Sequence, residues 1–217
     1  MRRPAVIAHR AGPDGRYREN SIEAVDAAME LGVDGIEIDV RRSRDGEYFV
    51  FHDPEVPKLG AIADLPAARL GALPTLDAFL PHATRGLVFL DIKMPYPVRD
   101  LVKIAERHLP ADRIIFGSFW HPFIREIKTY RPKLRGAVTL EARLVDPVGA
   151  AREAKADILA INDRFIDSNT VQEAHRAGLE VYPWTVNELS EIKRLQSLRV
   201  DAIITDRPSR LLRPSNR

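Results

Sequence analysis

The stretch "GIEIDVRRSRDGEYFVFHD", residues 35–53, combines an apolar strand pattern with two carboxylates and a tight turn. Successive side chains of a strand point to opposite faces, so Glu37 and Asp39 share one face and the β-branched residues around them occupy the other. The dipeptide Asp45-Gly46 is typical of a two-residue hairpin turn. One interpretation is an amphipathic strand with its acids in water. The other is that the two carboxylates form part of a functional site.

The hairpin itself favours the second interpretation. A two-residue turn at Asp45-Gly46 sets the pairing of the two strands and places Asp39 directly opposite His52. Directly opposite residues of an antiparallel pair share a face. A hairpin formed by residues near 36–52 therefore predicts that Glu37, Asp39 and His52 converge.

The rest of the chain alternates apolar strand patterns with helical patterns. This alternation predicts an α/β fold with a parallel sheet covered by helices. About eight of each favour a closed (β/α)8 TIM barrel, with the hairpin as an extension, over an open doubly wound sheet. The glycine-rich nucleotide-binding motifs of open sheets do not occur. The expected strands are 6–10, 35–40, 47–53, 86–93, 113–119, 135–140, 157–162, 180–186 and 201–206, and the expected helices lie near 21–31, 75–82, 97–108, 122–130, 146–155, 168–177, 188–198 and 208–213.

Composition limits the class of protein. The 217 residues suit one domain over 1–217, and 45% hydrophobic with 29% charged residues is typical of a soluble globular protein. A net charge of +2 without basic clusters argues against nucleic acid as a partner. There is no cysteine, which excludes thiol catalysis and cysteine-ligated metals. No apolar run reaches the length of a membrane span or a signal-peptide core, so we expect a cytoplasmic monomer or homodimer without stable membrane insertion.

The first helix has recognisable end signals. Asn20 followed by Glu23 three residues later resembles a capping box, which predicts Asn20 as the N-cap residue. Gly32 lies just past the last periodic residue, where helices often end.

Polar side chains gather at the carboxyl ends of the apolar runs, which is the active face of a (β/α)8 barrel. A single charged residue at a strand end is usually structural, whereas acids and histidines at several strand ends together are harder to explain in that way. They are His9, Arg10, Glu37, Asp39, His52, Asp53, Asp91, Lys93, Ser118, Glu141, Asn162, Trp184 to Asn187, and Asp206.

Three of these carboxylates, Glu37, Asp39 and Asp91, would repel one another at close range unless a positive charge lay between them. A hard divalent cation with oxygen ligands, Mg²⁺ or Ca²⁺, meets that need. The alternative is a salt-bridge cluster with Lys93 and Arg10. Those two cations also suit a phosphate group, Arg as a bidentate fork and Lys as a point charge.

Two histidines lie at the ends of predicted strands, close to these acids. His9 and His52 can serve as general acid and general base near neutral pH. The alternative for each is a hydrogen-bonded core histidine. Trp184, Asn20 and Glu141 can line a substrate pocket, and they are equally well explained as packing, capping or solvated residues.

These residues and their order in the sequence resemble those of a known family. The segment "AHRAGPDGRYRENSIEAVDAAMELGVDGIEIDVRRSRDGEYFVFHDP" is similar to the start of glycerophosphodiester phosphodiesterases. Further similar segments are "PTLDAFL" (74–80), "LDIK" (90–93), "GSF" (117–119), "WTVN" (184–187) and "AIITDRP" (202–208). The resemblance covers nearly the whole chain, and its ordered set of motifs is specific.

The resemblance implies a barrel shared with phosphoinositide-type phospholipases C. The implied reaction is metal-dependent hydrolysis of a small-molecule glycerophosphodiester to an alcohol and sn-glycerol 3-phosphate. In the matching motifs Glu37, Asp39 and Asp91 are the metal ligands. His9 and His52 match the acid/base pair, and Arg10 and Lys93 match the phosphate contacts.

The chain departs from the family pattern at three positions. Ala11 replaces a usual Gly, Arg18 replaces a usual Pro, and Asp91 replaces a usual Glu. The segment between His52 and Pro74 is also short. Two alternatives stay open: a phosphodiesterase that acts on lysophospholipids in the manner of a lysophospholipase D, and a non-catalytic phosphate-binding barrel.

Overall fold

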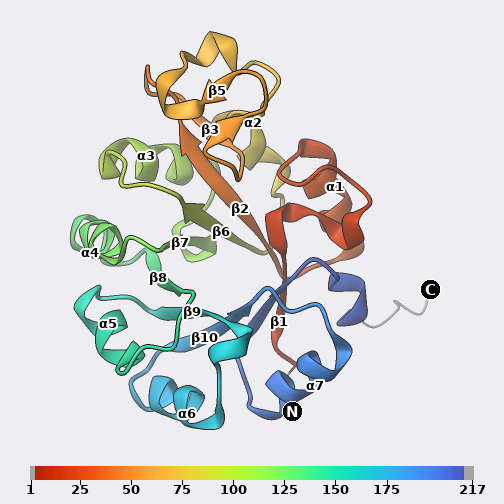
Figure 1. Cartoon of the computed structure of the whole chain (residues 1–217), viewed down its shortest axis with the longest axis vertical. Coiled ribbons are helices and arrows are strands. Elements are labelled where there is room, and N and C mark those ends of the chain that lie inside the picture. The colour runs from red at the N-terminus through yellow and green to blue at the C-terminus, as the bar shows by residue number, and fades with distance from the viewer. Residues whose placement is uncertain (1–2, 213–217) are drawn as a thin grey trace.

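Eight parallel strands surround the centre of the molecule (Figure 1). The structure is a computed structural model that describes residues 3–212. The order of the strands is β10-β9-β8-β7-β6-β2-β1-β11. Backbone hydrogen bonds from Asp201 N to Val181 O (3.1 Å) and from Val186 N to Ile204 O (2.9 Å) join the two end strands. The predicted α/β class and (β/α)8 barrel are therefore confirmed. The strands are β1 (Ala5–Ala8), β2 (Gly35–Arg42), β6 (Leu87–Ile92), β7 (Ile114–Ser118), β8 (Arg135–Leu140), β9 (Ile158–Asn162), β10 (Glu180–Trp184) and β11 (Ala202–Thr205).

Helices form a ring outside the strands (Figure 1). They are α1 (Ile22–Leu31), α2 (Leu76–Phe79), α3 (Val98–His108), α4 (His121–Tyr130), α5 (Pro147–Glu153), α6 (Ser168–Arg176) and α7 (Leu189–Ser197). The eighth expected helix, 208–213, is only a 3-10 turn at Pro208–Arg210, and residue 213 lies outside the described residues. Other 3-10 turns are His9–Ala11, Pro13–Gly15, Ile62–Asp64, Ala67–Arg69, Leu80–His82, Ala111–Arg113 and Asp163–Phe165.

The strands are apolar on both faces because both faces are buried, as is usual for parallel sheets under helices. One set of side chains fills the space between strands and helices, and a smaller set fills the barrel. The barrel set is Ile7, Phe89, Ile115, Ala137, Ile158, Ala160, Tyr182, Ala202 and Ile204. A filled interior leaves room for a site only at the barrel ends.

The predicted hairpin is present, and it extends beyond the barrel (Figure 1). Strand β2 pairs antiparallel with β3 (Tyr48–Val50), and a small ribbon of β4 (Glu55–Val56) and β5 (Gly60–Ala61) follows. That ribbon was not predicted from the sequence.

The predicted register of the hairpin is wrong by one residue. Val40 pairs with Val50, and Phe51 N donates to Asp39 O at 3.0 Å, so Asp39 lies opposite Phe51 and not His52. The reason is the turn, which spans the three residues 44–46 because Ser43 N donates to Glu47 O (2.8 Å). A third loop residue with positive φ, here Gly46 at 103°, is the usual alternative to a two-residue turn.

The start of α1 also differs from the prediction. The N-cap residue is Ser21, whose side chain accepts from Ala24 N (3.2 Å), and not Asn20. Asn20 is buried with φ of 58°, and its side-chain amide donates to Asp39 Oδ2 at 2.7 Å. The N-cap residue therefore lies one position later than predicted, because the Asn20 side chain hydrogen-bonds to Asp39 and does not cap the helix. The helix end at Gly32, with φ of 84°, is confirmed.

No helix within residues 3–212 is long and apolar enough to cross a membrane. The single domain over 1–217, the cytoplasmic location and the monomeric or dimeric state stay predictions.

Candidate active site

A cavity of about 360 Å³ opens at the carboxyl ends of the barrel strands. It receives all eight predicted site residues, and seven further residues complete its lining. The complete lining is His9, Arg10, Glu37, Asp39, His52, Phe89, Asp91, Lys93, Phe119, Thr139, Glu141, Ala160, Trp184, Thr185 and Ile204.

The three predicted carboxylates meet on two neighbouring strands. Asp39 on β2 and Asp91 on β6 are direct register partners, and Glu37 lies two residues before Asp39 on the same face. Each of the three offers an oxygen within 4.8 Å of the others, and their exposed fractions are only 4%, 1% and 7% for Glu37, Asp39 and Asp91. The interpretation of Glu37 and Asp39 as the wet face of an ordinary strand is therefore wrong.

The two basic side chains that were predicted to bind phosphate contact these acids directly. Lys93 Nζ lies 2.5 Å from Asp39 Oδ1 and 2.5 Å from Asp91 Oδ2. Arg10 Nε is 3.6 Å from Asp39 Oδ2, and the Arg10 backbone N–H donates to Glu37 Oε2 at 2.8 Å. These ion pairs form part of the salt-bridge cluster that the sequence left open as an alternative.

The pKa values show how far the two cations balance the acids. Burial opposes ionisation of Asp39, but Lys93 and Asn20 outweigh it and lower its pKa. Burial raises the pKa of Asp91 despite Lys93. Burial, followed by the charge of Asp39, raises the pKa of Glu37 to about 8. Lys93 and Arg10 therefore do not keep all three carboxyls ionised at neutral pH.

The donor set fits a hard divalent cation. Asp91 Oδ1 is buried and has no hydrogen-bond partner among the described residues. The three ligand candidates are all carboxylates, and such oxygen donors suit Mg²⁺ and Ca²⁺. Glu37, Asp39 and Asp91 are the residues that would hold the cation.

His9 is held by a network that reaches β11. Its Nδ1 lies 2.7 Å from Asp206 Oδ1, and Asn187 Nδ2 donates to Asp206 Oδ2 at 2.7 Å. Burial opposes a charge on His9, but the hydrogen bond to Asp206 and the charge of Glu37 outweigh it and raise the His9 pKa. Asp206 keeps a lowered pKa because the contact with His9 outweighs its burial. An ionised carboxylate only accepts, so His9 Nδ1 donates and Nε2 remains for chemistry.

His52 reaches the cavity although the predicted register is wrong. Strand β3 ends at Val50, so alternation no longer sets the direction of the His52 side chain. The Arg41 guanidinium donates to His52 O (Nη2 at 2.6 Å), and His52 Nδ1 lies 2.8 Å from Asp53 Oδ1. The side chain of His52 is 40% exposed, against 18% for His9.

Sequence reasoning missed three contributions. Asp206 orients His9, Asn20 fixes Asp39, and Thr139 lines the cavity. Asp206 could have been predicted as a site residue, because it lies at the end of a strand pattern. Thr139 lies inside a strand pattern, so its position gave no such indication. Trp184 lines the cavity as predicted, and its ring packs edge-to-face on Phe119 at 5.8 Å between centroids.

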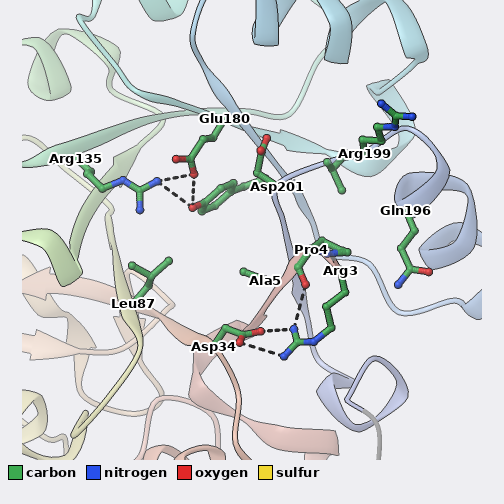
Figure 2. A pocket seen from close by; sticks show the side chains of 12 residues that line it. Arg3, Pro4, Ala5, Asp34, Leu87, Arg135, Glu180, Gln196, Arg199 and Asp201 are labelled. Atoms are coloured by element: carbon green, nitrogen blue, oxygen red, sulfur yellow. Dashed lines mark hydrogen bonds and ion pairs between the residues drawn. The ribbon is translucent and has the colours of Figure 1, made fainter. Parts of the chain in front are cut away.

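A second, larger cavity of about 920 Å³ lies at the amino ends of the strands (Figure 2). Its acids have basic partners: Asp34 contacts Arg3, Glu180 contacts Arg135, and Asp201 contacts His175 outside the cavity lining. None of the eight predicted site residues lines it.

The fold and the cavity define a (β/α)8 barrel with acids, imidazoles and cations at its carboxyl end. Residues 9–86 and 91–210 match the model of the glycerophosphoryl diester phosphodiesterase family, and the chain belongs to that family. The family resemblance and the enzyme class expected from the sequence, a phosphoric diester hydrolase, are confirmed.

Individual relatives agree over nearly the whole length. A glycerophosphodiester phosphodiesterase of Caldanaerobacter subterraneus subsp. tengcongensis is 31% identical over 95% of this chain and 96% of its own. One from Bacillus altitudinis is 28% identical over 96% of both. Among solved structures, an Oleispira antarctica phosphodiesterase in complex with the product sn-glycerol-3-phosphate superposes with a TM-score of 0.86 at 24% identity, over 96% of this chain and 95% of its own.

Proposed function

We propose that this enzyme hydrolyses glycerophosphodiesters to an alcohol and sn-glycerol 3-phosphate, using a bound Mg²⁺ or Ca²⁺ and two histidines. The observation that carries the proposal is the convergence of three buried carboxylates and two imidazoles on one cavity. The names of the related enzymes support the substrate class.

The cation is the finer part of the proposal. Glu37, Asp39 and Asp91 hold it, and when bound it supplies positive charge that offsets the charge of the phosphodiester. Lys93 and Arg10 lie beside the same carboxylates, which supports a role for both in binding the phosphoryl oxygens. The guanidinium binds as a fork and the ammonium as a point charge.

The two histidines divide the proton transfers. His9 and His52 each have a carboxylate at Nδ1, which leaves Nε2 of each ring to meet the substrate. One takes the proton of the attacking water or glycerol 2-hydroxyl, and the other donates a proton to the leaving alkoxide. If the 2-hydroxyl attacks, a water then opens the cyclic phosphate to give sn-glycerol 3-phosphate. The networks behind them keep the rings oriented throughout.

The direct test is release of sn-glycerol 3-phosphate from glycerophosphocholine or glycerophosphoethanolamine, with and without a chelator. We expect release that disappears in excess chelator and returns with Mg²⁺ or Ca²⁺. Full activity in chelator would remove the metal from the proposal. No release from either substrate would remove the substrate class.

A ligand variant separates the metal site from the fold. Burial raises the pKa of Glu37 to about 8, so Glu37→Gln replaces a largely protonated buried carboxyl with a neutral amide of similar shape. We therefore expect unchanged or higher apo stability together with loss of metal binding and turnover. The matched control is Glu126→Gln on the exposed surface of α4, which should change neither. Calorimetric metal titration and thermal unfolding measure both properties, and wild-type metal binding by Glu37→Gln would contradict the assignment.

A further inference from the structure

The two histidines of the cavity are supported in different ways. The ring of His9 contacts Asp206, which Asn187 holds in turn. The ring of His52 contacts its sequence neighbour Asp53, whose side chain is 65% accessible. An exposed neighbour on the same short segment moves together with His52, so this contact does not fix where the segment lies. The position of His52 therefore depends on how its backbone is held.

The sheet does not hold this backbone. Strand β3 ends at Val50, and the hairpin ladder ends with the bond from Phe51 N to Asp39 O. The extra turn residue is the reason, because it shifts the pairing by one position and leaves His52 beyond the last paired residue. Among residues 3–212, the hydrogen bonds to the His52 backbone come from a side chain and not from another backbone group.

That side chain is Arg41 on the partner strand. Arg41 Nε and Nη2 both donate to His52 O, at 3.0 and 2.6 Å. Alternate residues of a strand share a face, so Arg41 lies on the same face of β2 as Glu37 and Asp39. His52 lines the cavity and Arg41 does not. Arg41 therefore reaches the site through the carbonyl of His52.

The chemistry of the side chain suits this contact. A guanidinium is planar and presents its N–H groups as a fixed fork, whereas an ammonium is a point charge with rotatable donors. The two acids nearest in charge to Arg41 among the proposed metal ligands, Asp39 and Asp91, each contact Lys93 at 2.5 Å. The lysine thus pairs with the carboxylates, and the fork of Arg41 is used for direction on a neutral carbonyl.

We propose that Arg41 is a positioning residue for catalysis, whose two hydrogen bonds to the carbonyl of His52 hold the imidazole of His52 in the cavity. The inference rests on the proposed role of His52 and deepens it. A misplacement of about 1 Å costs on the order of 10²-fold in rate. Loss of Arg41 should therefore lower kcat and leave KM nearly unchanged, because Arg10 and Lys93, which are proposed to bind the phosphate, are kept.

The first test is kinetic. Arg41→Met keeps an extended side chain and removes both donors, and we expect kcat for glycerophosphocholine to fall by about 10–100-fold. Arg41→Lys keeps the charge and one donor, so it should recover part of this loss. The matched control is Arg44→Met at the exposed turn of the same hairpin, which removes the same charge and should keep wild-type kcat. Full recovery in Arg41→Lys would assign the effect to charge and overturn the inference.

A double-mutant cycle shows whether Arg41 acts through His52. Residues that act as a unit give losses that do not add. In the background of His52→Gln the further change Arg41→Met should lower kcat by less than about 2-fold, because the ring that Arg41 positions is already gone. Losses that add in full would overturn the inference.

A measurement without turnover separates this inference from the proposed function. In Arg41→Met the ¹⁵N order parameter of the His52 amide should fall from about 0.85, which is typical of a rigid backbone, to below about 0.6. The amide of Val50 inside β3 is the internal control and should keep its value. An unchanged order parameter at His52 would overturn the inference. A mobile His52 in Arg41→Met, with a wild type that releases no sn-glycerol 3-phosphate, would overturn the proposed function alone.

Discussion

The two ends of the barrel each hold a cavity, and they differ in how their polar groups are satisfied. The amino-end cavity is the larger, about 920 against about 360 Å³. Its acids are nevertheless paired: Figure 2 shows Arg135 beside Glu180 and Arg3 beside Asp34. Arg135 also donates to the Tyr182 hydroxyl at 3.1 Å. The carboxyl-end cavity instead gathers buried like charges and unpartnered polar atoms.

Cavity size is therefore a poor guide to where the chemistry-bearing residues of this barrel gather. Paired ions at the amino end satisfy one another and stabilise the fold, as is usual at that end of a (β/α)8 barrel. At the carboxyl end three buried carboxyls lie close together, and burial raises the pKa values of Glu37 and Asp91, which is characteristic of functional sites. If chemistry is confined to the carboxyl end, variants at the two ends of the barrel should differ in their effects on kcat.

The largest effect is expected from the two histidines. His9→Gln and His52→Gln should each lower kcat by about 10²–10⁴-fold, because each removes a general acid or base. Steady-state kinetics with glycerophosphocholine measures the loss. The matched control is His175→Gln near the amino end, whose ring contacts Asp201 and which should retain wild-type kcat. Retained activity in both His9→Gln and His52→Gln would remove acid/base catalysis by these rings.

A second pair of variants compares two aspartates that flank the same strand. Asp206 follows β11 and holds His9 at 2.7 Å, and Asp201 precedes β11 and holds His175 at 2.9 Å. Asp206→Asn should lower kcat by about 10–100-fold, the range for residues that orient metal-ligating histidines. Asp201→Asn should instead lower stability by about 1–2 kcal/mol, through the weakened contacts to His175 and Val181 N.

Two readouts distinguish positioning from general damage in Asp206→Asn. KM should change less than kcat, and the ¹⁵N spectrum of His9 should show loss of the preferred Nδ1–H tautomer. A spectrum and kcat like those of the wild type would mean that Asp206 does not orient His9. A loss of kcat in Asp201→Asn equal to that in Asp206→Asn would erase the difference between the two barrel ends.

A smaller effect is expected from Arg10→Lys. The charge is kept but the planar fork is lost, so we expect KM for a glycerophosphodiester to rise about 10-fold with kcat less affected. Arg10 Nη1 donates to Glu19 Oε2 at 2.7 Å, and the buried Nε has no hydrogen-bond partner among the described residues, which leaves the Nε–Nη2 edge of the fork for a phosphate. An unchanged KM would show that Arg10 does not bind the substrate.

The smallest effect is expected from Arg3→Gln at the amino end. Arg3 and Asp34 are both substantially exposed, with 46% and 36% of their side chains accessible, and exposed ion pairs contribute little. The free energy of unfolding should fall by less than about 1 kcal/mol. Denaturant unfolding and kinetics check both properties, and a clear drop in kcat would indicate a functional role for the larger cavity.

The side-chain pattern of the sequence was enough to predict the barrel and the residues that gather in its carboxyl-end cavity. Strand and helix alternation is a local property of side-chain period, so the order of elements followed from it. Because parallel strands end at one rim, residues at strand ends such as His9, Asp91 and Lys93 were predicted together without knowledge of distances. Their roles in the reaction stay predictions.

The contacts that support the site residues could not be predicted from the sequence, because they depend on the folded chain. The hairpin register depended on one extra turn residue, which local sequence preference does not fix. Asn20 does not cap α1, because its buried side-chain amide donates to Asp39 Oδ2 and accepts from Asp39 N. Asp39 lies nineteen positions away in the sequence. The same holds for Asp206 and His9, which lie 197 positions apart and meet because the barrel closes between β11 and β1. Contacts of this kind arise when distant strands become neighbours, so no local pattern encodes them.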